Sequence, residues 1–102
     1  MVVFSRGVED SRVEEGLRLV AAMLGMDQPP AVVFMDEGLG ILTEGALEDP
    51  LTREYLTTAS DMAGFYAIDA TSVEVDPGLD VTPLTIDELA KMMEECKAVV
   101  AY

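Results

Sequence analysis

An apolar run that ends abruptly in polar residues constrains the fold more than any other part of this 102-residue chain. Residues 31–35 read Ala-Val-Val-Phe-Met, and Asp36, Glu37 and Gly38 follow them directly. An unbroken apolar run of this length is typical of a parallel strand that helices cover on both faces. In open α/β sheets the ligand crevice lies beyond the carboxyl ends of such strands. The run therefore predicts a fold class and the end of the sheet where a site would lie.

The segments on either side of this run complete an α/β pattern. Apolar stretches predict strands, and residues at helical spacing predict helices between them. We expect strands at residues 1–5, 31–35, 65–68, 81–84 and 98–102, and helices at residues 11–25, at 51–63 and from 86 onward. This order predicts one domain, residues 1–102, with an α/β fold: a small three-layer sandwich whose mostly parallel sheet has about five strands.

Helix starts are marked by short polar motifs. Ser11 with Glu14, and Thr85 with Glu88, have the spacing of a capping box. Asp49 before a proline is suited to the residue that caps a helix start. Helical spacing predicts the inward-facing residues of the last two helices: Leu51, Tyr55, Leu56, Ala59 and Met62 in one, and Ile86, Leu89, Ala90, Met93 and Cys96 in the other.

The charge balance excludes several classes of partner. Twenty acidic and six basic residues give a formal charge of −14, which would repel a phosphate backbone, so we expect no nucleic-acid binding. No run approaches the roughly 18 apolar residues of a membrane span, so we expect no membrane partner. A single cysteine and no visible export signal predict a cytoplasmic protein.

The chain contains no histidine. This excludes Ser-His and Cys-His pairs and the usual zinc sites. No complete glycine-rich fingerprint for a dinucleotide or a phosphate is present either. We therefore expect no cofactor and no metal, and the chain is more typical of a binding or assembly protein than of an enzyme.

Three segments, taken in order, resemble the DsrE/DsrF/TusC family of small sulfur-relay proteins, and most of all its DsrF/TusC branch. The first reads Val-Val-Phe-Met-Asp-Glu-Gly-Leu-Gly-Ile-Leu-Thr-Glu-Gly over residues 32–45. The second reads Gly-Phe-Tyr-Ala-Ile over 64–68, and the third Cys-Lys-Ala-Val-Val-Ala-Tyr over 96–102. The resemblance implies a five-stranded α/β domain that assembles into oligomers, either with itself or with cysteine-bearing sulfur-relay subunits.

The resemblance also indicates where a sulfur-carrying cysteine would stand. DsrE-type members carry it after the third strand, whereas DsrF-type subunits often lack that role. The corresponding stretch here is Asp69-Ala70-Thr71-Ser72, without a cysteine. The resemblance therefore implies a subunit that supports sulfur relay without accepting the sulfur itself.

Cys96 is the only thiol, so any persulfide chemistry depends on it. It falls near the expected C-terminal end of its helix, where the helix dipole is negative, and Glu94 and Glu95 precede it. Both effects disfavour the thiolate, with Lys97 a partial offset. Helical spacing also turns Cys96 toward the core, so we expect a buried, unreactive thiol.

The polar residues after the first three strands form a predicted crevice: Arg6, Asp36, Glu37, Gly38, Asp69, Thr71 and Ser72. Arg6 could pair with Asp36 or bind an anionic ligand. The Asp36 carboxylate is expected to accept hydrogen bonds from the following glycine turn. Thr71 and Ser72 are expected to cap the turn after the third strand.

The resemblance and these residues together leave three functions open. The first is a non-catalytic DsrF/TusC-like subunit, with Met92 and Tyr102 as candidates for an exposed contact surface. The second is a sulfurtransferase that carries persulfide on Cys96. The third is a stand-alone binder of small molecules that uses the predicted crevice.

Overall fold

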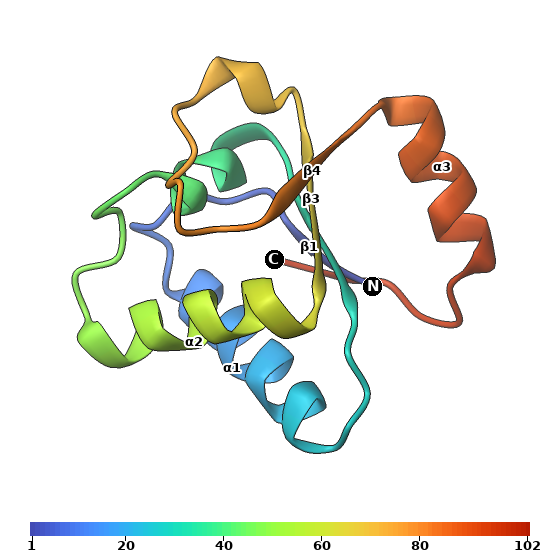
Figure 1. Cartoon of the computed structure of the whole chain (residues 1–102). Coiled ribbons are helices and arrows are strands. Elements are labelled where there is room, and N and C mark those ends of the chain that lie inside the picture. The colour runs from blue at the N-terminus through green and yellow to red at the C-terminus, as the bar shows by residue number, and fades with distance from the viewer.

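The computed structural model describes residues 1–102 and places a five-stranded sheet between two helical layers (Figure 1). The strands are β1 Val2–Phe4, β2 Ala31–Phe34, β3 Gly64–Ile68, β4 Val81–Leu84 and β5 Val100–Ala101. They lie in the order β4-β3-β2-β1-β5, and every neighbouring pair is parallel. The predicted α/β class is confirmed, and the sheet is entirely parallel.

Three α-helices and two 3₁₀-helices connect the strands. Their bounds are α1 Ser11–Gly25, α2 Pro50–Met62, α3 Ile86–Glu95, η1 Asp36–Leu42 and η2 Ala70–Ser72. The helices α1 and α2 lie together on one face of the sheet, and α3 lies alone on the other (Figure 1). None of them combines the length and the apolar character that a membrane crossing requires.

The motifs at the helix starts are confirmed in two cases out of three. The Asp49 side chain accepts from the Leu51 amide, and Thr85 and Glu88 form the reciprocal capping box. At α1 the prediction is wrong, because Asp10 caps the helix by accepting from the Arg12 amide. Ser11 is already the first helical residue, so Asp10, one position earlier, is the cap.

The larger core lies between the sheet and the two helices α1 and α2. Its aromatic rings form a row across four strands: Tyr102 beyond β5, Phe4, Phe34 and Phe65. Ring centroids lie 5.8 Å apart for Tyr102 and Phe4, 5.3 Å for Phe4 and Phe34, and 5.1 Å for Phe34 and Phe65. Separations of this size are typical of stabilising aromatic pairs. This face therefore closes as one continuous aromatic and aliphatic layer.

The second core is much smaller. It consists of Val3, Val33 and Leu84 from the sheet and of Leu89 from α3. Leu89 is the only buried residue of α3, whereas Ile86 is 58% exposed. The prediction of the inward face of α3 is therefore only partly correct, because the sheet covers only part of the apolar side of the helix.

Several apolar side chains differ from the sequence expectation. Leu51 and Met62 of α2 are exposed, although helical spacing placed them inward. Tyr102 and Met92, expected at a contact surface, are half-buried against the protein's own two cores. The exposed apolar side chains near α3 and β5 are instead Ile86, Met93, Val99 and Val100.

Candidate functional site

The carboxyl ends of β2 and β3 turn into the next segment in the same way. Phe34 and Ala67 are paired in the sheet, and two residues beyond each of them stands an aspartate with positive φ: Asp36 at 52° and Asp69 at 59°. Aspartate tolerates this left-handed conformation better than most residues do. Each aspartate leads into a 3₁₀-helix, η1 or η2. The apolar run 31–35 therefore ends at the carboxyl edge of the sheet, as the polar residues that follow it predicted.

Close packing closes this end of the sheet over β1 and β2. A Cβ atom added to Gly38 would overlap the carbonyl oxygen of Phe4, so only glycine fits there. The Met35 amide donates to the same Phe4 oxygen at 3.0 Å, and the Gly38 amide donates to the Met35 carbonyl at 2.9 Å. The buried residues Leu39, Ile41 and Leu42 then anchor η1. The geometry gives Gly38 a packing role.

The other residues of the predicted crevice lie at this end of the sheet, but their side chains form no hydrogen bond or ion pair with one another. Arg6 donates from Nη1 to Asp10 Oδ2 at 3.4 Å and makes no pair with Asp36. The Asp36 carboxylate accepts no hydrogen bond, and the Gly38 amide of the turn donates to the Met35 carbonyl instead. Glu37, like Asp36, is exposed. The predicted Arg6 pairing and the predicted Asp36 turn contacts are therefore wrong.

The segment after β3 also differs from the expectation. Thr71 and Ser72 are exposed, and the turn is closed by the Ser72 amide donating to the Asp69 carbonyl at 3.0 Å. No side chain caps this turn, and the Thr71 and Ser72 hydroxyls contribute nothing to its closure. Whether this segment contacts a ligand or a partner stays a prediction.

Cys96 lies at the opposite end of the sheet. The helix α3 begins after the carboxyl end of β4 and leads to the amino end of β5, and Cys96 follows its last residue. The amino group of Met1 donates to the Ala98 carbonyl at 2.9 Å, which places this loop beside the start of β1. The thiol is half-buried rather than buried, which corrects the expectation. Cys96 and the predicted crevice therefore cannot form one site.

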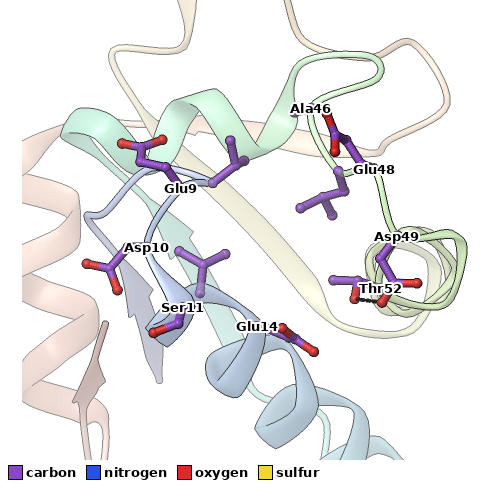
Figure 2. A pocket seen from close by; sticks show the side chains of 11 residues that line it. Glu9, Asp10, Ser11, Glu14, Ala46, Glu48, Asp49 and Thr52 are labelled. Atoms are coloured by element: carbon purple, nitrogen blue, oxygen red, sulfur yellow. Dashed lines mark hydrogen bonds between the residues drawn. The ribbon is translucent and has the colours of Figure 1, made fainter.

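A cavity of about 450 Å³ lies between the start of α1 and the start of α2 (Figure 2). Glu9, Asp10 and Glu14 line one side, and Glu48 and Asp49 line the other. Val8, Val13, Ala46 and Leu47 supply its apolar lining. No basic side chain lines it, so the cavity disfavours anions.

Sequence reasoning missed this cavity, although a signal was present. A Glu-Asp pair stands before each of two helices, at Glu9-Asp10 and at Glu48-Asp49. Both aspartates cap the helix that follows them. Asp10 accepts from the Arg12 amide at 2.9 Å, and Asp49 accepts from the Leu51 amide at 3.2 Å and from the Thr52 hydroxyl at 2.9 Å. No group of three metal-ligating side chains occurs here or elsewhere in the chain.

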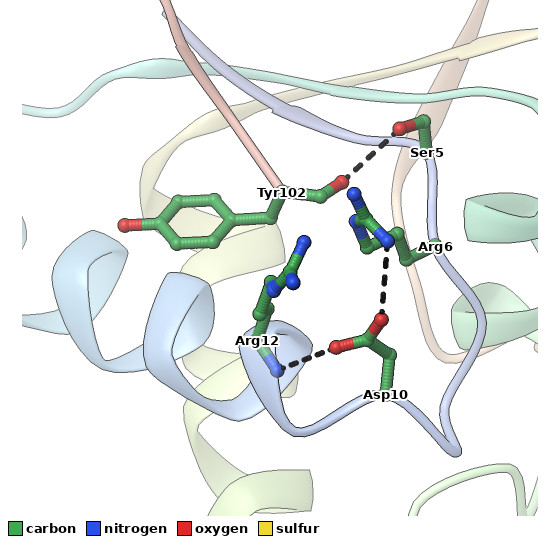
Figure 3. A network of polar contacts seen from close by, with 5 residues as sticks. All are labelled: Ser5, Arg6, Asp10, Arg12 and Tyr102. Carbon is green, nitrogen blue, oxygen red and sulfur yellow. Dashed lines mark hydrogen bonds and ion pairs between the residues drawn. The ribbon is translucent and has the colours of Figure 1, made fainter.

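Asp10, which lines this cavity, accepts from the Arg12 amide at 2.9 Å and from Arg6 Nη1 at 3.4 Å (Figure 3). The Arg12 amide, then the charges of Arg12 and Arg6, hold the pKa of Asp10 below its ordinary value. A lowered pKa in the folded state means that the contact stabilises the protein above the ordinary aspartate pKa. That contribution is lost as the pH falls through the lowered pKa. Beside this network, the Ser5 hydroxyl donates to the Tyr102 carbonyl at 3.2 Å.

A second cavity, of about 420 Å³, is a groove on the outer surface of α1 and α2. Leu24 of α1 and Leu51, Tyr55 and Met62 of α2 give it an apolar lining. Neither cavity is lined by a residue of the predicted crevice.

Comparison with known proteins supports the fold. The structure is similar to the crystal structure of the ychN protein from E. coli, with a TM-score of 0.74. The similarity covers 99% of this chain and 97% of that chain at 15% sequence identity. No protein-family model and no curated protein matches the sequence. At this identity the likeness shows a shared three-layer fold and leaves the chemistry to the residues of this chain.

Proposed function

We propose that this protein is a non-catalytic DsrF/TusC-like subunit that assembles into an oligomer and supports sulfur relay. The observation that carries the proposal is the composition of the segment after β3. Asp69-Ala70-Thr71-Ser72 stands where the family it resembles carries its sulfur-accepting cysteine, and it contains no thiol. Without a base such as histidine, the Thr71 and Ser72 hydroxyls are poor nucleophiles.

The position of Cys96 also supports a non-catalytic role. The thiol lies at the amino end of the sheet, whereas sites in parallel α/β sheets lie at the carboxyl end. Cys96 follows the last residue of α3 and is half-buried, so it is not displayed at an open site. The shared fold with the ychN protein supports the family assignment at the level of architecture.

Persulfide transfer provides the test. In a transfer, the Cys96 thiolate would attack the outer sulfur of a donor persulfide, and the donor thiol would leave. We expect the intact mass of the native protein to stay unchanged after exposure to a small-molecule persulfide donor. A gain equal to one sulfur atom that is absent from Cys96→Ser would instead establish the sulfurtransferase alternative and overturn the proposal.

Assembly is tested separately by mixing the protein with a cysteine-bearing chain of the same fold. We expect the two chains to elute together from a size-exclusion column, or this chain to elute alone as an oligomer. Elution as a single chain in both experiments would contradict the assembly role, whatever the thiol does.

A further inference from the structure

The two edge strands of the sheet differ in how they are protected. The edge strand β4 contains Pro83, which has no amide hydrogen, and Asp80 precedes the strand. The opposite edge, residues 98–101, reads Ala-Val-Val-Ala, without proline or charge. Proteins commonly block exposed edges with proline, charge or a bulge, because an unblocked edge pairs with another strand. We propose that the β5 edge pairs with the β5 edge of a second copy of this chain, a pairing that rests on the assembly role proposed above.

The hydrogen bonds of β5 show which of its groups remain available. The amides of Val100 and Tyr102 donate to the carbonyls of Met1 and Val3, at 3.0 and 2.8 Å. The carbonyls of Ala98 and Tyr102 accept from Met1 and Ser5. Residues 98, 100 and 102 therefore point their backbone groups at β1. By the alternation of a strand, the backbone groups of Val99 and Ala101 point outward, ready to pair with another strand.

The side chains at this edge also lack a cover. Val99 is 39% exposed and Val100 is 40% exposed. Val100 lies on the α1 and α2 face, since it pairs with the core residue Val2, and Val99 therefore lies on the α3 face. A strand added at the edge would cover apolar surface on both faces of the sheet at once.

Charge favours a second copy as the occupant. Two copies of a chain with a net charge of −14 repel one another over most of their surfaces. Residues 96–102 contain no acidic side chain and one lysine, Lys97, so the side chains of this segment add no negative charge to the repulsion. A basic partner would be drawn to the acidic surfaces instead. An uncharged edge that meets its own copy across a two-fold axis forms an interface in which each chain supplies the same surface.

Val99→Pro tests the pairing, and Val99→Thr is its matched control. The proline removes an outward amide and leaves the Val100 and Tyr102 amides that bond to β1. We expect wild type to sediment as a dimer, or as a multiple of one, and the proline variant to dissociate at a roughly tenfold or more higher concentration, because a symmetric pair loses two backbone donors. The threonine variant keeps the amide and should assemble like wild type.

The outcomes separate this pairing from the assembly role in general. An oligomer of unchanged mass in Val99→Pro would overturn the β5 pairing and leave assembly through another surface. A wild type that stays a single chain would also overturn the pairing, while co-elution with a cysteine-bearing chain would still support the subunit role.

Amide hydrogen exchange of the unmodified protein provides a second measurement, which does not depend on the folding of a variant. Pairing predicts that the Val99 and Ala101 amides exchange slowly in concentrated solution and more rapidly on dilution. Rapid exchange of both amides at high concentration, in a protein that otherwise protects β1 and β2, would overturn the pairing.

Discussion

The two faces of the sheet are covered very differently. On one face, α1 and α2 and the 3₁₀-helix η1 bury a cluster of 14 residues that includes Phe4 and Phe34. On the other face, α3 contributes Leu89 to a cluster of four. The helices supply eight of the 14 residues in the first cluster and one of the four in the second, so most of the difference arises from the helices.

The difference shows that an amphipathic helix does not bury all of its apolar residues. The second face is crossed by one helix of ten residues, because the chain must pass from β4 at one edge to β5 at the other. A helix on this path touches the sheet through few side chains, and Ile86 and Met93 remain exposed. We therefore expect the first face to determine most of the stability of the fold.

The largest loss of stability should come from removing a buried side chain from the core of the first face. Phe34→Ala removes a fully buried ring between Phe4 and Phe65 and should lower the free energy of unfolding by about 3–5 kcal/mol. Leu89→Ala on the second face should cost about 2 kcal/mol, at the low end for a buried leucine. Urea unfolding of both variants measures the difference. An equal or larger loss for Leu89→Ala would contradict the comparison.

A smaller effect should come from pushing α1 away from the first face. A Cβ atom at Gly16 would overlap the Phe4 ring, so Gly16→Ala should cost about 1–2 kcal/mol, after the gain in helix propensity is counted. Gly25 in the same helix has no neighbour within 4 Å of its added Cβ atom, so Gly25→Ala should be neutral or slightly stabilising. Thermal unfolding of the pair separates close packing from helix propensity. Destabilisation of similar size in both would show that α1 does not pack as closely as described.

The smallest effect should appear on the second face, where local interactions replace packing. Thr85→Ala removes the side chain that accepts from the Glu88 amide at 3.1 Å, and should cost about 1 kcal/mol. Because α3 has little other support, we expect its amides to exchange faster with solvent in this variant while those of α1 stay unchanged. Equal acceleration in both helices would mean that the two layers unfold as one unit.

Much of the fold could be predicted from the sequence. The apolar run 31–35 contains β2, the Asp49-Pro50 signal starts α2, and the Thr85 and Glu88 pair starts α3. Such local signals depend on neighbouring residues and so are visible in the sequence alone. The exposure of Leu51 and Met62 was not predictable, because it depends on how far α1 covers α2 and not on helical spacing.

The candidate site was predicted less well than the fold. The sequence correctly placed polar residues beyond the carboxyl ends of β2 and β3, but Arg6 turned to Asp10, four residues away, instead of to Asp36. The Arg6–Asp10 ion pair joins residues four positions apart and needs no tertiary contact. The predicted Arg6–Asp36 pair would have joined the ends of two strands. The acidic cavity was missed because it depends on α1 and α2 starting side by side, which no single segment of the sequence encodes.

The pairing of β5 with β1 has a consequence for how the chain reaches its folded state. The bonds that join residues 1–5 to residues 98–102 span 97 to 99 positions along the chain. On a ribosome, β1 would leave the exit tunnel long before its second neighbour had been synthesised. Loops of that length close slowly, and folding rates fall as contacts become more distant along the chain. The first face can therefore supply most of the stability, while residues 96–102 control how long a newly made β1 remains open on one side.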